Sequence, residues 1–277
     1  MPSSNAIIAV VKMLVRLLLV LAITTPLLSA DSSAIRPKRK LSLFNRRNLD
    51  GWYTWLRENK YQDPNKVFPV KNGILRLSGE EWGGIATKNA YRDYHLIVEW
   101  KWGGPNHGKR EKAARDSGIL VHARGEDGAA GRVWLESIEC QIIEGGTGDF
   151  IVVGGKTRPS LTVETRVGPD KQLYWQKGGK PETRDRGRFN WFGRDIEWKD
   201  TLGFRGRQDI EKPAGRWNRY EIVCDVDTIT NRLNGVVVNA GMKAVPSEGK
   251  IQIQSEGAEV RIRKIELRPV NRRQVSD

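Results

Sequence analysis

Histidine is scarce in this 277-residue sequence, which contains only three. His95, His107 and His122 form no His-x-His or Glu-x-x-His pair, and this absence argues against a structural zinc site. A divalent cation bound by His122, Glu139 and a third carboxylate stays open as a cofactor, although no motif supports it. The sequence therefore leaves the cofactor and any metal site unassigned.

Cysteine is equally rare, with Cys140 and Cys224 as its two occurrences. Each lies in an apolar run that is typical of a strand. An oxidising compartment would allow the two thiols to form a disulfide, but nothing in their spacing fixes the pairing.

Apolar runs long enough to cross a membrane are absent after residue 30. Residues 1–30 have Lys12 and Arg16 as their only charges, followed by the apolar run 17–23 and a small-residue exit at Ser29-Ala30. This order is typical of a secretory signal, and the run is too short for a stable membrane span. We predict a signal peptide over 1–30, a single domain over 31–277, and a periplasmic or secreted protein.

Motifs that are typical of nucleic-acid binding, phosphate binding and serine hydrolases are also missing. The net charge is +14, but the basic residues are scattered and form no helix-turn-helix, zinc-finger or basic-zipper pattern. We therefore expect a generally basic surface and no nucleic-acid partner. The glycine-rich string 145–149 lacks the Lys-Ser/Thr of a P-loop, and no Gly-x-Ser-x-Gly elbow occurs.

Helical periodicity is lacking as well, because no long segment repeats its apolar residues every 3.6 positions. Short apolar runs bounded by Gly, Asn or Asp take its place, and Asn234-Gly235 between two such runs predicts a tight hairpin. The sequence predicts an all-β antiparallel β-sandwich. The runs are 74–77, 95–102, 118–122, 138–143, 150–153, 220–226, 235–238, 251–254 and 260–267.

The region 155–213 does not follow this pattern of short apolar runs, since it has many basic and aromatic residues and little alternation of apolar and polar residues. We expect a long, ordered loop that covers one sheet face, because loops of this length in compact domains are usually functional.

The run 138–143 supplies the main candidate residues. Side chains alternate along a strand, so Glu139 and Gln141 share one face while Cys140 and Ile142 take the other. Either the polar pair lines a sugar-binding cleft, or it faces water on the open side of an antiparallel sheet. His122 ends the run 118–122, where it would serve as acid, base or metal ligand, or as a hydrogen-bonded rim histidine.

Nine strings along the chain, taken in order, resemble the 3-keto-disaccharide hydrolase family. They cover about residues 41–270 and are 44–52, 72–75, 91–101, 116–122, 138–143, 215–218, 233–235, 249–257 and 260–265. The resemblance implies a concanavalin-like jelly roll with a concave sugar-binding sheet, export, and cleavage of 3-keto-glycosides. Two positions depart from the family pattern: Asp116 stands where Asn is common, and Lys264 where Asn often follows Arg263.

That chemistry requires a base, a stabiliser of the oxyanion and an acid for the leaving oxygen. We expect Glu139 to transfer the proton, His122 to assist it, and Arg263 to stabilise the enolate. Substrate would be a carbohydrate, and the predicted binding residues are Gln141, Lys101, Trp82, Asp116 and Gln254, with Trp82 as a loop platform for a sugar ring.

Two alternatives remain at this stage. The domain would bind carbohydrate without cleaving it, or it would be a laminarinase-type endoglycanase. The string Glu139-Cys140-Gln141-Ile142-Ile143-Glu144 copies the longer spacing of the endoglycanase carboxylates, with Gln in place of Asp. A β-bulge would be needed to bring Glu144 to the face of Glu139.

Overall fold

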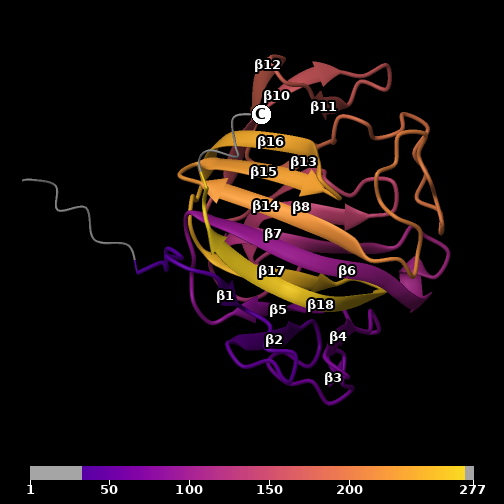
Figure 1. The fold of residues 1–277 in the computed structure, drawn as a ribbon. Coiled ribbons are helices and arrows are strands. Elements are labelled where there is room, and N and C mark those ends of the chain that lie inside the picture. The colour runs from indigo at the N-terminus through magenta and orange to yellow at the C-terminus, as the bar shows by residue number, and fades with distance from the viewer. Residues whose placement is uncertain (1–32, 272–277) are drawn as a thin grey trace, which may run out of the picture. The chain divides into compact units, whose positions relative to one another are not determined.

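The computed structural model describes residues 33–271, of which those from Ala34 onward belong to one compact unit. The predicted signal peptide lies outside the described residues. Two antiparallel sheets make up the described chain (Figure 1), and its one helical element is the short 3-10 turn η1 (Gly108–Arg110). The prediction of an all-β sandwich of jelly-roll type is confirmed. No helix in this part of the chain is long and apolar enough to span a membrane.

The larger sheet contains eleven of the described strands, and β6 lies at its centre between β14 and β18. Its strands are β1 (Leu41–Ser42), β3 (Val70–Lys71), β4 (Ile74–Leu77), β6 (Tyr94–Asn106), β10 (Ser160–Val167), β11 (Leu173–Trp175), β12 (Lys180–Arg184), β14 (Asn218–Asp225), β15 (Thr228–Leu233), β16 (Val236–Val245) and β18 (Ala258–Pro269).

The smaller sheet has seven described strands in the order β13-β9-β8-β7-β17-β5-β2. They are β2 (Trp52–Leu56), β5 (Gly83–Thr87), β7 (Asp116–Arg124), β8 (Glu136–Ile143), β9 (Phe150–Val153), β13 (Gly187–Phe189) and β17 (Lys250–Ser255). β7, β8 and β9 are consecutive in sequence, whereas β2, β5, β13 and β17 join them from distant parts of the chain.

The hydrophobic core lies between the two sheets. Leu96, Val98 and Trp100 of β6 belong to the same buried cluster as Cys140 and Ile142 of β8. Burial of each aliphatic side chain among them, Leu96, Val98 and Ile142, stabilises the fold by about 1.5–3 kcal/mol relative to its exposure. The alternate residues of β7, β8 and β17 therefore turn toward the outer face of the smaller sheet.

The predicted hairpin at Asn234-Gly235 is confirmed. β15 ends at Leu233, β16 begins at Val236, and the two turn residues have φ values of 49° and 93°. Two successive turn residues with positive φ are typical of the two-residue hairpin turn, whose twist matches that of the flanking strands.

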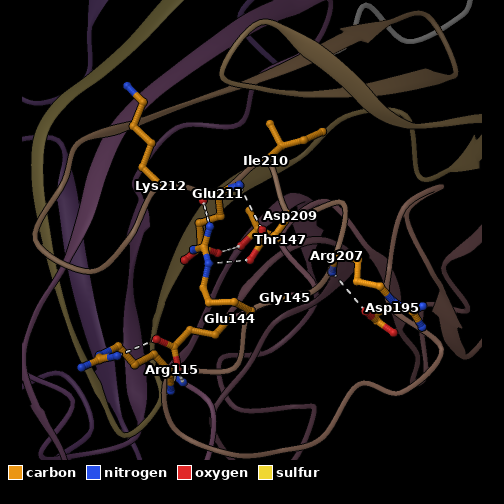
Figure 2. Close-up of polar contacts among 12 residues, drawn as sticks. Arg115, Glu144, Gly145, Thr147, Asp195, Arg207, Asp209, Ile210, Glu211 and Lys212 are labelled. Carbon is orange, nitrogen blue, oxygen red and sulfur yellow. Dashed lines mark hydrogen bonds and ion pairs between the residues drawn. The ribbon is translucent and has the colours of Figure 1, made fainter.

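The region 155–213 is only partly a loop, because it contains β10, β11, β12 and β13. Its last part, residues 190–213, is fixed to the turn between β8 and β9 by buried polar contacts (Figure 2). Thr147 donates a 2.6 Å hydrogen bond to Glu211, and Trp102 Nε1 donates another of 2.6 Å to the same carboxylate. The expectation of an ordered segment holds for these contacts, whereas the four strands of the region were not predicted because its sequence shows little apolar alternation.

Cys140 and Cys224 are both buried and both free. They come from different sheets, β8 and β14, and both belong to the core cluster.

Candidate functional site

Strand register builds one continuous row of side chains across the outer face of the smaller sheet. One residue from each of the seven strands takes part, and consecutive members are direct cross-strand partners. We call this set the site row. Its members, in order across the sheet, are Arg188, Ile151, Glu139, Leu120, Gln252, Ala86 and Tyr53.

Glu139 and Gln141 lie on this outer face, while Cys140 and Ile142 enter the core. The predicted alternation is therefore confirmed. Glu139 is only 5% exposed and Gln141 only 3%, so neither is an ordinary solvent-facing side chain. The interpretation of the pair as a solvated face is wrong.

Gly118 makes room for this arrangement. It is the cross-strand partner of Gln141, and a Cβ built on it would collide with the side-chain oxygens of Glu139 and Gln254. Glu139 from β8 and Gln254 from β17 therefore meet directly above the Gly118 backbone of β7. A side chain at this position would separate them, which explains glycine in the middle of a buried strand.

Asp116 joins the group from the start of β7. Gln141 Nε2 donates a 3.0 Å hydrogen bond to Asp116 Oδ1, and Arg110 Nη1 lies 3.4 Å from Asp116 Oδ2. Glu139, Gln141, Asp116 and Gln254, all predicted from the sequence, are thus brought together by the fold.

Burial has the largest effect on the pKa values of the carboxyl groups in this site. Desolvation, followed by the negative charge of Asp116, raises the pKa of Glu139 to about 8, against the lowering effect of Arg188. Desolvation also raises the pKa of Asp116, opposed by Arg110 and Arg188, and raises that of Glu256, in the turn after β17, well above its usual range. Each group holds its proton more tightly than a free carboxyl, as proton-transfer residues near neutral pH do.

Amide groups on the same face have atoms without a protein partner. Among the described residues, Gln141 Oε1, Gln254 Oε1 and Gln252 Nε2 are buried and form no hydrogen bond to another protein group. Buried polar atoms in folded proteins are nearly always hydrogen-bonded, so these three are suited to a polar ligand such as a sugar with its hydroxyl groups.

Aromatic side chains occupy the opposite end of the face. Trp134 and Tyr53 pack against Ala86 and Leu120 of the site row. Trp82 stacks on Trp134 with ring centroids 6.4 Å apart. Trp82 therefore lies at the aromatic end of the same face as Glu139, and the Arg57 guanidinium lies 4.8 Å from the centroid of its ring.

His122 is not part of the group. A β-bulge between Val121 and Arg124 and a left-handed φ of 52° turn its side chain away from the face of Leu120. It is fully buried, its Nδ1 donates a 3.0 Å hydrogen bond to the Pro246 carbonyl, and it packs edge-on against Tyr94. Burial lowers the pKa of His122 to about 4. The expectation that it opens beside Glu139 is wrong.

Arg263 and Lys101 are also elsewhere, on the outer face of the larger sheet. Arg263 Nε lies 2.7 Å from Glu99 Oε2, and both cations lie over the ring of Trp217, at 4.5 Å for Arg263 and 4.9 Å for Lys101. They lie on the other sheet from Glu139, so the expectation that they act beside it is wrong. Alternation identifies outward residues in a strand, but it cannot tell which of the two sheets the strand joins.

Glu144 does not provide the second carboxylate of an endoglycanase pair. β8 ends at Ile143, and Glu144 accepts hydrogen bonds from the Arg115 side chain at 2.5 Å and from the Gly203 amide at 2.8 Å. Within residues 33–271, no group of three or more His, Cys, Asp or Glu side chains is placed to hold a metal ion.

Three charged residues of the site were not predicted from the sequence. Arg188 lies in the region 155–213, where alternation is weak, and it reaches Glu139 only through the β8-β9-β13 pairing. Arg110 is in the 3-10 turn, and Glu256 lies in the string 249–257 that carried the family resemblance. That string was the one available indication of Glu256.

Comparison with known proteins gives one family and several solved structures. The family model described as the 3-keto-alpha-glucoside-1,2-lyase-like domain matches residues 40–268. A search of curated proteins found no match.

Three of the similar solved structures are the following. A putative glycosyl hydrolase from Parabacteroides distasonis has a TM-score of 0.49 and 16% identity, over 84% of this chain and 94% of that one. The carbohydrate-binding module CBM66 from Bacillus subtilis has 0.43 and 10%, over 78% and 94%. A Bacillus licheniformis beta-glucanase has 0.42 and 12%, over 82% and 96%.

Proposed function

This chain belongs to the family of 3-keto-alpha-glucoside-1,2-lyase-like domains, and we propose that it cleaves 3-keto-glycosides with Glu139 as the base. The family makes it a carbohydrate-active, glycosyl-hydrolase-like protein. The observation that carries the finer proposal is a buried carboxyl of raised pKa on the same sheet face as three buried amides that each have one atom without a hydrogen-bond partner.

The reaction starts with the acidic hydrogen on sugar carbon 2, next to the ketone at carbon 3. The base removes this proton, and the electron pair moves onto the ketone oxygen as an enolate. When the enolate collapses, the bond from carbon 1 to the aglycone oxygen breaks, and that oxygen takes up a proton. Addition of water to the resulting double bond completes a hydrolysis, whereas release before it makes the protein a lyase.

Glu139 is suited to the first step for two reasons. It lies on a rigid central strand, where its direction is set by the register of β8 with β7 and β9. Desolvation, together with the neighbouring charge of Asp116, raises the pKa of Glu139, so the ionised form is a stronger base than an exposed glutamate.

Arg188 takes the role that the sequence assigned to Arg263, stabilising the enolate. Its guanidinium is held by Asp149, with Nη1 2.5 Å from Oδ2, and it contributes to the electrostatics of both Glu139 and Asp116. A cation fixed before the reaction stabilises developing negative charge without reorganisation. Asp149 also binds Arg194 and the Trp191 amide, so it is itself immobile.

Glu256 is our proposal for the acid that protonates the leaving oxygen. Desolvation raises its pKa well above the usual range, so it keeps its proton to a higher pH than an exposed glutamate does. The free oxygens of Gln141 and Gln254 and the free amide nitrogen of Gln252 would bind hydroxyl groups, and Trp82 would stack on a ring.

Incubation of the protein with a 3-keto-glucoside and with its unoxidised parent, with and without chelator, tests the proposal. We expect release of the aglycone from the keto-sugar only. Binding without cleavage would favour a carbohydrate-binding module, and cleavage of the parent would favour an ordinary glycosidase. Loss of activity with chelator would show that a cation takes part.

A further inference from the structure

A second polar surface lies on the larger sheet, away from the site row, and is a groove of about 340 Å³. We call it the basic groove. Its lining contains four cationic side chains and no carboxylate; the residues are Lys71, Asn72, Ile74, Arg76, Lys101, Trp217 and Arg261.

Strand register places three of the cations directly opposite one another. Arg261 of β18 is the cross-strand partner of Arg76 on β4 and of Lys101 on β6. Like charges at directly opposed positions destabilise a sheet, and neighbouring strands are only about 4.8 Å apart. Such a row requires compensating negative charge.

Carboxylates in the neighbourhood neutralise only part of this charge. Arg76 and Arg261 share the buried Glu259, each at 2.7 Å, and Arg76 also lies 3.9 Å from Glu80. Lys71 and Lys101 have no carboxylate within ion-pair distance in the described part of the chain. The basic groove therefore has a net positive charge that a bound anion would offset.

We propose that the basic groove binds a polysaccharide that carries carboxylate groups. A straight row of cations across three strands matches anionic groups repeated along an extended chain. The guanidinium fork of arginine also fits carboxylates in a bidentate manner.

Other polyanions fit the groove less well. Single-stranded nucleic acids need free aromatic rings for base stacking, whereas Lys101 and Arg263 already lie over the ring of Trp217. No described helix is available to enter the major groove of a duplex. A lipid surface would require apolar side chains for insertion, and Ile74 is the one aliphatic residue of the lining.

Calorimetric titration with polygalacturonate, and with neutral dextran as the control ligand, tests this proposal. The double variant Lys71→Gln/Lys101→Gln should bind polygalacturonate roughly tenfold more weakly than the wild type, since it loses one charge contact at the exposed Lys71 and one at the half-buried Lys101. The control variant Lys88→Gln/Lys243→Gln makes the same change in net charge at exposed positions elsewhere and should bind as the wild type does.

Equal weakening in both variants would show that overall charge, and not the basic groove, is responsible. Absence of polygalacturonate binding, or tighter binding of single-stranded oligothymidine or of phosphatidylglycerol vesicles with the same variant dependence, would also overturn the proposal. Unfolding temperatures of both variants, measured in parallel, exclude misfolding as the cause. The titration needs no catalytic turnover, so its result is independent of the function proposed for Glu139.

Discussion

Replacing Glu139 by Gln should abolish most of the activity and, at the same time, stabilise the fold. Glutamine has the same size and lacks the titrating proton, so the side chain above Gly118 keeps its shape. Loss of a positioned acid–base group typically lowers the rate by ~10²–10⁴-fold. We expect kcat for a 3-keto-glucoside to fall by about that factor while sugar binding is nearly unchanged.

The gain in stability follows from the raised pKa. Glu139 titrates near pH 8 in the folded protein, whereas the unfolded chain releases the same proton near the ordinary value of 4.5. Folding must therefore take up a proton between these limits, and the stability that neutral Glu139 contributes below pH 4.5 is lost progressively as the pH rises to 8. At pH 7 this amounts to roughly 3 kcal/mol. Glutamine stays neutral at every pH and avoids the loss.

Urea unfolding of both proteins at several pH values, together with steady-state kinetics, measures the two effects. The difference in unfolding free energy should be small at pH 4.5 and should grow toward pH 8. Glu197→Gln removes an exposed carboxylate and is the matched control, with no change expected in rate or in the pH dependence. Normal turnover by the Glu139 variant, or a stability difference that does not vary with pH, would refute the reasoning.

Three further outcomes are expected. In Gly118→Ala, the added methyl group should collide with Glu139 and Gln254, lowering both activity and unfolding free energy, the latter by about 1–3 kcal/mol in urea titrations; unchanged values would exclude a crowded site. In Arg188→Gln, kcat should fall by about 10²–10³-fold, and the pH at which kcat/KM rises should move upward from about 8, because Arg188 lowers the pKa of Glu139. N-terminal sequencing of exported protein should give a start near Asp31, and a start at Met1 would contradict the predicted signal peptide.

The sequence predicts strand faces reliably because alternation is a local property. Glu139 and Gln141 turn outward and Cys140 inward, as the two-residue period requires. The hairpin at Asn234-Gly235 is local in the same sense, since both turn residues need a positive φ that Asn and Gly adopt readily.

Properties that depend on distant partners could not be predicted in this way. The bulge that redirects His122 shows up as a register shift between β7 and β8, and no residue type marks it in advance. Arg263 and Lys101 alternate outward as expected, but β18 and β6 pair with each other in the larger sheet. Arg188 enters the site through two successive strand pairings, so its sequence neighbours give no indication of its role.

The same packing that forms the core also fixes the candidate site. A slip of β8 by one residue against its neighbours would turn Cys140 and Ile142 outward and bury Glu139 between the sheets, where a carboxyl group has no partner. The hydrophobic core therefore selects one register, and that register alone places Glu139 in line with Arg188. Because the site row takes one residue from each of seven strands, a core substitution that shifts any of these strands will be felt at Glu139, even though it contacts no substrate.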